Sequence, residues 1–281
     1  MLLFVDNLTN SDFCFLDPKR GLLGETWLSH ITLEGDLDGQ GMVCDFGTVK
    51  AAVRQLLDEH IDHCLLVPSH SPHVTIHQGQ AKTDVRWRME NGNQIHHQSP
   101  PQCVTLIEAE VINTETVGTW CENELRRLLP DSLKAIDVSF SCEKIDSAYY
   151  HYGHGLKKHA GKCQRIAHGH RSKIEIWCNG ERNLTLESDW ANNYADSYIA
   201  TRIDLLNNED CPENHYQFKY QAPEGEFFLQ LPQDQCYLID SDSTVEHIAN
   251  HIATTLKENC PQNTYVVKAY EGISKGAIAS C

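Results

Sequence analysis

Three histidines and one cysteine lie close together in the segment from His154 to His170. His168 and His170 flank Gly169, so on an extended strand both imidazoles point to the same face, and His154 can supply a third. Three histidines with an open fourth position form a catalytic type of zinc site, whereas four protein ligands close a structural one. The segment therefore predicts that His154, His168 and His170 hold Zn²⁺ in an enzyme. The alternative is chance, because the chain has 16 histidines, but the basic loop that carries Cys163 disfavours it.

The sequence around this cluster resembles one enzyme family. An aromatic stretch from Tyr150 ends in His154, and the loop Gly161-Lys162-Cys163 leads to His168-Gly169-His170. This order is similar to that of the 6-pyruvoyltetrahydropterin synthase and 6-carboxytetrahydropterin synthase family. The resemblance implies the tunnelling fold (T-fold), an α+β architecture of antiparallel sheets with helices on one face, which closes into a barrel when several copies assemble.

Family-like segments occur twice along the 281 residues, which predicts two tandem T-fold domains, residues 1–147 and 148–281. The segment 41–46 (G-M-V-C-D-F) belongs to the first copy, and 242–248 (D-S-T-V-E-H-I) to the second. Each copy also has a long connection, ending at Cys103 in the first and at Cys236 in the second. The function of the extra region 68–103 is left open by the sequence.

The two copies differ in the motifs that they keep. The first has Leu23-Gly24-Glu25 where the second has the histidine pair, so we expect it to hold no zinc. It keeps Asp62-His63, for which the second copy has Asp204-Leu205. These complementary losses predict one composite site per chain. The alternative is that both copies have decayed and neither site works.

The family resemblance also implies roles for individual residues. Cys163 is expected to act as the general base, with Asp62 and His63 relaying protons from the other copy. The substrate implied is 7,8-dihydroneopterin triphosphate, a small pterin triphosphate. Glu271 would anchor the pterin ring with help from Thr244, although Glu143 occupies the position of Glu271 in the first copy and is the alternative anchor.

The four residues between Cys163 and His168 fit neither branch of the family, so this spacing does not decide which product is made. The favoured interpretation is a 6-carboxytetrahydropterin synthase of the queuosine (7-deazaguanine) pathway, a lyase that releases acetaldehyde and triphosphate. The alternatives are a 6-pyruvoyltetrahydropterin synthase, which only eliminates triphosphate, and a catalytically inactive pterin-binding paralogue.

Composition restricts the partners and the location. The net charge of −16 argues against nucleic acid, and no apolar run is long enough for a membrane span. Six cations between Lys157 and Lys173 predict a local landing patch for the triphosphate. Twelve cysteines without C-x-x-C pairs, and an N-terminus unlike a secretory signal, favour the cytoplasm. We expect a homo-oligomer, with two chains per ring, because a lone chain leaves sheet edges exposed.

Hydrophobic periodicity predicts the main elements. Alternation of apolar and polar residues indicates strands at 27–35 and 172–178, and apolar stripes indicate helices at 46–60, 117–129 and 243–256. Ser243 and Glu246 have the spacing of a capping box at the start of the last helix.

Overall fold

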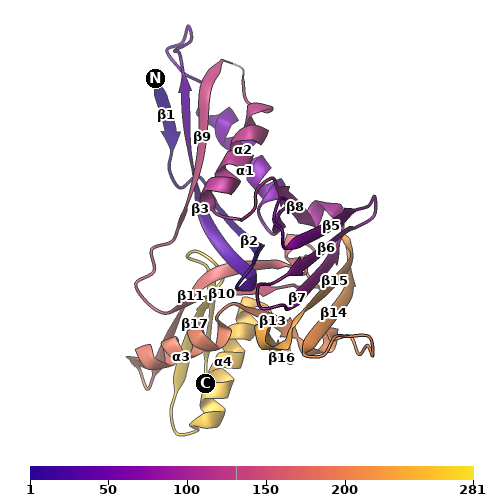
Figure 1. Cartoon of the computed structure of the whole chain (residues 1–281). Coiled ribbons are helices and arrows are strands. Elements are labelled where there is room, and N and C mark those ends of the chain that lie inside the picture. Colours follow the sequence, from indigo (N-terminus) through magenta and orange to yellow (C-terminus); the bar gives the residue numbers. More distant parts are fainter. Residues whose placement is uncertain (131) are drawn as a thin grey trace.

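The computed structural model describes residues 1–130 and 132–281, and it contains two similar α+β units and a sheet that joins them (Figure 1). In the first unit, a six-stranded sheet has the order β1-β3-β2-β4-β8, and β9 also pairs with β3. Its strands are β1 (Leu2–Val5), β2 (Asn10–Asp17), β3 (Gly21–Gly35), β4 (Leu65–Pro68), β8 (Val104–Ile107) and β9 (Leu133–Cys142). Helices α1 (Phe46–His60) and α2 (Thr114–Arg126) pack on one face of this sheet.

The second unit repeats this order as β16-β13-β10-β11-β17-β18, with β12 also paired to β11. Its strands are β10 (Tyr149–His154), β11 (His168–Cys178), β12 (Glu181–Arg182), β13 (Ser197–Thr201), β16 (Cys236–Ile239), β17 (Tyr265–Tyr270) and β18 (Gly276–Ser280). Helices α3 (Leu184–Tyr194) and α4 (Val245–Asn259) pack on it. Both sheets are mixed, because β2-β4-β8 and β10-β13-β16 pair in parallel while the other strands pair antiparallel.

The long connections of the two copies meet in a third sheet of five antiparallel strands. These strands are β5 (Val74–Gln78), β6 (Thr83–Arg88), β7 (Gln94–Ser99), β14 (His215–Ala222) and β15 (Gly225–Pro232), and short 3₁₀ helices lie at Pro101–Cys103, Lys162–Gln164, Arg202–Asp204 and Gln233–Gln235. The extra region 68–103 thus joins the copies through the pairing of β7 with β15. Between the units lies a shared apolar core with residues of both, such as Leu65, Trp87, Tyr198 and Phe218.

The two copies are related by a pseudo-two-fold arrangement. Strands β7 and β15 occupy equivalent places in the copies and pair antiparallel with each other, as a two-fold relation requires. Equivalent glycines also meet: Gly24 is opposite Cys14 on β2–β3, Gly169 is opposite Gly153 on β10–β11, and a Cβ on Gly169 would lie 2.7 Å from the Gly24 Cα. Because the contact is isologous, each contact position between the copies has an equivalent position at which the roles of the two copies are exchanged.

Several element boundaries differ from the sequence-based expectation. The strands predicted at 27–35 and 172–178 begin earlier, at Gly21 and His168, because each continues through its glycine. Helix α2 begins at Thr114, where Asn113 and Thr116 form the capping box. The capping box predicted at Ser243 is wrong: Thr244 caps α4, and its side chain accepts the backbone N–H of His247. Within the described residues, no helix has the length and apolar character needed to cross a membrane.

Candidate composite active site

Three buried imidazoles lie together where β10 ends and β11 begins. His154 is directly opposite His168 in the antiparallel pair, and His170 follows two residues later on the same face. One ring nitrogen from each lies within 4.8 Å of the others, and the Nε2 atoms of His154 and His170 are 3.2 Å apart. The strand geometry therefore assembles the predicted three-histidine cluster.

Backbone carbonyls orient two of these rings. The carbonyl oxygen of Ser243 lies 2.8 Å from Nδ1 of His154, and that of Arg165 lies 2.8 Å from Nδ1 of His168. Each Nδ1 is thereby committed to donating a proton, and Nε2 is left as the free lone pair. Nε2 of His168 is buried without a hydrogen-bond partner. This arrangement fits a metal ion, which is the partner that such an orphaned nitrogen lacks.

The charge state of the cluster agrees with metal binding. Burial, together with the neighbouring imidazoles, holds the pKa of His154 and that of His168 well below the ordinary value. Both rings are therefore neutral near pH 7, and a neutral imidazole is the form that ligates a metal.

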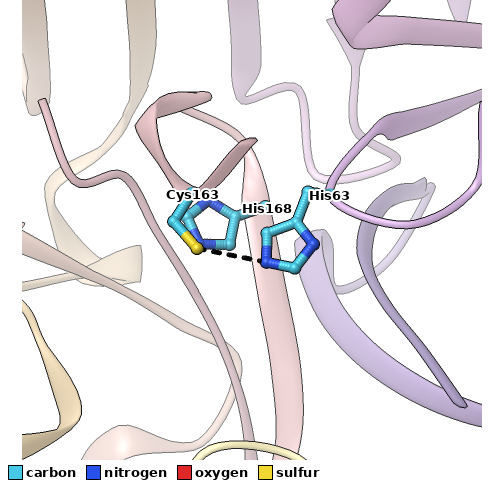
Figure 2. A group of neighbouring side chains, drawn as sticks. All are labelled: His63, Cys163 and His168. Atoms are coloured by element: carbon cyan, nitrogen blue, oxygen red, sulfur yellow. Dashed lines mark hydrogen bonds between the residues drawn. The ribbon is translucent and has the colours of Figure 1, made fainter. Parts of the chain in front are cut away.

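The first copy supplies the acid–base pair Asp62-His63 at the edge of this cluster, and Figure 2 shows His63 of this pair beside Cys163 and His168. Nε2 of His63 is 3.4 Å from Sγ of Cys163, and the His63 ring stacks on that of His168 with centroids 4.9 Å apart. Oδ2 of Asp62 lies 2.7 Å from Nδ1 of His63 and orients the ring. The structure thus brings together Cys163 of the second copy and the pair Asp62-His63 of the first within one chain.

Local backbone geometry places His63 for this contact. Its φ of 58° is in the left-handed region, in the turn between α1 and β4, and its N–H donates to the carbonyl of Asp12 over 2.6 Å. Burial would lower the pKa of His63, but the interactions with Asp62 and Cys163 outweigh it and raise the pKa to about 10. The ring is therefore held as a cation beside the cysteine sulfur.

The counterpart of this pair in the second copy differs from the sequence-based assignment. Asp204-Leu205 follows β13, whereas Asp62-His63 precedes β4, its equivalent. The strand registers Cys14 with Leu65 and Gly153 with Tyr198 make Asp196 the equivalent of His63, and its φ of 56° matches. The expectation that the second copy lacks the histidine holds, but the assignment to Asp204-Leu205 is wrong, because that segment lies after its strand whereas Asp62-His63 lies before the equivalent strand.

The two predicted pterin-binding residues lie beside the cluster. Oε1 of Glu271, just after β17, is 3.7 Å from Nε2 of His170, and its side chain is partly exposed. Thr244 caps α4, next to the Ser243 carbonyl that faces His154, and it lines a small pocket of about 160 Å³. Glu143, the alternative anchor, lies 3.4 Å from Lys173, in contact with the second copy.

The predicted cationic landing patch is largely neutralised. Lys157 pairs with Asp204, Lys158 with Asp242 and Arg165 with Glu224. The remaining cations also have partners: Lys162 donates to the Asp58 carbonyl, Arg171 to the Glu143 carbonyl, and Lys173 lies near the Glu143 carboxylate. The sequence could not show this, because these carboxylates lie far away along the chain.

Two further positions near the site have contacts that the sequence did not indicate: Asp12 had no motif to mark it, and Arg165 was predicted only as one of the patch cations. Asp12 is a buried carboxylate on β2, and Arg165 is a buried cation that reaches Glu224 and lies 3.0 Å from Sγ of Cys64, the neighbour of His63. For Asp12 the only signal is a charged residue in the otherwise apolar strand segment D-F-C-F-L.

The fold and this site together define a duplicated T-fold protein with one composite histidine and cysteine centre. The family model of 6-pyruvoyl tetrahydropterin synthase matches residues 12–151 and again residues 144–280. The chain belongs to this family, whose members are metal-dependent lyases acting on pterins. The two matches overlap, so the boundary between residues 147 and 148 stays a prediction.

Other comparisons give little beyond this. The chain is similar to a catalytic-residue mutant of Plasmodium vivax 6-pyruvoyltetrahydropterin synthase (21% identity, 50% of this chain and 90% of that chain, TM-score 0.42). It is similar to the Plasmodium falciparum enzyme at 17% identity, with the same coverage and a TM-score of 0.41. A comparison with curated proteins gave no match.

Proposed function

We propose that the protein is a zinc-dependent lyase that converts 7,8-dihydroneopterin triphosphate and one water molecule to 6-carboxytetrahydropterin, acetaldehyde and triphosphate, in the queuosine pathway. The observation that carries the proposal is the 3.4 Å approach of Cys163 to His63, beside three convergent imidazoles. These groups come from different copies, so a chance cluster within one strand pair does not explain them.

His154, His168 and His170 would hold the zinc ion through nitrogens that are already oriented. When bound, the ion supplies Lewis-acid polarisation of the oxygens on the substrate side chain. Cys163 would remove a carbon-bound proton as the general base, with the His63 ring beside its sulfur. Cys163 is partly buried, which limits access of bulk water to the reacting group.

His63 would then deliver a proton to the opposite side of the substrate side chain. Asp62 keeps the ring in the orientation that directs Nε2 at Cys163, as carboxylates do for catalytic histidines. Glu271 would accept hydrogen bonds from the ring N–H and amino groups of the pterin, and Thr244 would help to hold the ring through its backbone or hydroxyl. The composite arrangement requires both copies for every turnover.

The test is product analysis by mass spectrometry after zinc-loaded, reduced protein is incubated with 7,8-dihydroneopterin triphosphate. We expect 6-carboxytetrahydropterin with acetaldehyde. Formation of 6-pyruvoyltetrahydropterin instead would assign the alternative synthase activity. Unchanged substrate with bound pterin would identify a binding paralogue and contradict the lyase proposal.

A homo-oligomer in the cytoplasm is part of the same proposal. The edge strands of all three sheets, such as β8, β16 and β5, leave backbone groups that a second chain can pair. All twelve cysteines are free, consistent with a reducing compartment. Sedimentation of the purified protein would test the oligomer, and a monomer at micromolar concentration would contradict it.

A further inference from the structure

We infer that Asp12 is a positioning residue that joins the two halves of the composite site. Its side chain and its backbone each contact a different half: the carboxylate faces the histidine cluster of the second copy, and the peptide groups hold the acid–base pair of the first. The inference rests on the proposed function only in taking His170 as a metal ligand.

The backbone of Asp12 fixes the acid–base pair from both sides. Its N–H donates to Oδ1 of Asp62 over 3.0 Å, and its carbonyl accepts the N–H of His63 over 2.6 Å. These two bonds are made on β2, a central strand of the first sheet. The pair is therefore anchored to a rigid element although it lies in a turn.

The side chain of Asp12 reaches into the second copy. Its Oδ1 lies 3.2 Å from Nδ1 of His170, which is within reach of an ion pair, although the ring N–H is not aligned for a hydrogen bond. His154 and His168 have carbonyls on Nδ1, so Asp12 is the equivalent outer partner for His170, and outer partners of this kind orient a ligand and raise its basicity.

The carboxylate is itself fixed in place. Oδ1 accepts the hydroxyl hydrogen of Thr26 over 2.6 Å, and Oδ2 pairs with Lys275 over 3.0 Å, while the side chain is almost completely buried. Asp12 is therefore held in one orientation.

The pseudo-two-fold relation supplies a matched control. On β10 the position equivalent to Asp12 is His151, and it faces Glu25, the equivalent of His170, over 3.6 Å. Acid and base have exchanged places between the two pairs. The His151–Glu25 pair has similar surroundings and no histidine cluster, so its loss should alter stability without altering metal binding.

The experiment measures zinc affinity by competition with a chromophoric chelator, in the absence of pterin, for Asp12→Asn and His151→Asn. We expect about a 10–100-fold loss of affinity in Asp12→Asn, as for other outer partners of metal ligands, and no change in His151→Asn. Asp12→Glu should recover part of the loss. Unchanged zinc affinity in folded Asp12→Asn would overturn the inference.

If Asp12→Asn does not fold, Lys275→Met replaces it, because the Lys275 side chain is half exposed and its loss leaves the core intact. The same chelator competition should then show weaker zinc binding, since the carboxylate loses a partner that fixes it, and unchanged affinity would overturn the inference. Because no pterin is present, a failure of the lyase proposal leaves this result unaffected. Lyase activity combined with unchanged zinc affinity in the variants would reject the role of Asp12 alone.

Discussion

The pseudo-two-fold relation places two equivalent regions on the interface between the copies, and only one of them contains the histidine cluster and Cys163. In the composite site, formed by the three histidines with Cys163, Asp62 and His63, the loop of the second copy meets the turn of the first. The mirror site is formed by Arg20, Glu25, His151 and Asp196. Here the turn between β2 and β3 of the first copy meets the turn before β13 of the second. There Arg20 and Asp196 form an ion pair where Cys163 and His63 meet in the composite site.

The same backbone therefore supports two kinds of interaction. In the mirror site the three histidines of the cluster are replaced by Phe15, Leu23 and Glu25, and none of these three side chains offers a nitrogen to a metal. Burial raises the pKa of Glu25 to about 7, although Thr26, Arg171 and Arg20 oppose this, whereas Asp12 in the composite site stays charged. Duplication within one chain allows the two sites to differ. Each residue at the interface takes part in only one of the two sites, whereas in a symmetric dimer of identical chains it would take part in both.

The largest effect should come from removing the thiol. Cys163→Ala should lower turnover by about 10²–10⁴-fold, the usual contribution of a general base, while the zinc content stays at the wild-type level. Arg20→Ala, at the equivalent contact of the mirror site, should leave turnover unchanged. Product formation and metal content would be measured on the same samples. Normal turnover in Cys163→Ala would contradict the composite site.

A second prediction disturbs both sites at once, by adding a side-chain atom where the backbones of the two copies are in contact. A Cβ on Gly24 would lie 1.8 Å from the carbonyl oxygen of Tyr152 and 2.5 Å from the backbone nitrogen of His170. Because these are backbone atoms of a central strand, Gly24→Ala should lower the free energy of unfolding by about 3 kcal/mol or more and weaken zinc binding.

The matched control for this substitution is Gly39→Ala, where a Cβ meets nothing within 4 Å. Its free energy of unfolding should stay within about 0.5 kcal/mol of wild type in urea denaturation. Equal stability of the two variants would show that the copies are not in close backbone contact at Gly24.

A moderate, pH-dependent effect is expected at Glu25. Its folded-state pKa of about 7 exceeds the ordinary 4.5, so the folded chain binds the proton more tightly than the unfolded chain does. Stability should therefore fall as pH rises from 4.5 through 7, by about 3 kcal/mol at most. Burial lowers the pKa of His151, which opposes this trend, so the comparison must be made between variants.

Glu25→Gln removes the carboxyl and keeps its shape. At pH 8 this variant should be about 1–3 kcal/mol more stable than wild type, and the difference should vanish near pH 4. Urea denaturation at several pH values measures it. A difference that is constant with pH would mean that Glu25 does not titrate in this range.

Local sequence predicted the parts of the composite site that are defined by spacing. Two histidines on either side of Gly169 had to share a face, and the opposite end of the hairpin had to supply His154, so the cluster could be inferred from strand periodicity. Its meeting with Asp62 and His63 was inferred from the family resemblance, because nothing local relates residues 63 and 163.

What could not be predicted depends on contacts between distant segments. The role of Asp12 depends on three partners from different elements, and one of them, Lys275, is 263 positions away. The equivalence of Asp196 with His63 follows from strand register, which the divergent connections hide in the sequence. The partners that neutralise the loop cations, such as Glu224, were invisible for the same reason.

The smallest effect should come from the ion pair that replaces chemistry in the mirror site. Arg20 contacts Asp196 through two nitrogens, with Nε 2.8 Å from Oδ2, but both side chains are partly exposed. Solvent screening limits such pairs to about 0.2–1 kcal/mol, so a double-mutant cycle of Arg20→Ala and Asp196→Ala should give a coupling energy in that range. A larger coupling would mean that the pair holds the copies together, and the mirror site would then stabilise the geometry in which Cys163 meets His63. A coupling within the range assigns that task to the shared core, to the β7–β15 pairing and to the close packing of β3 on β10 and β11, which are the extensive contacts between the copies.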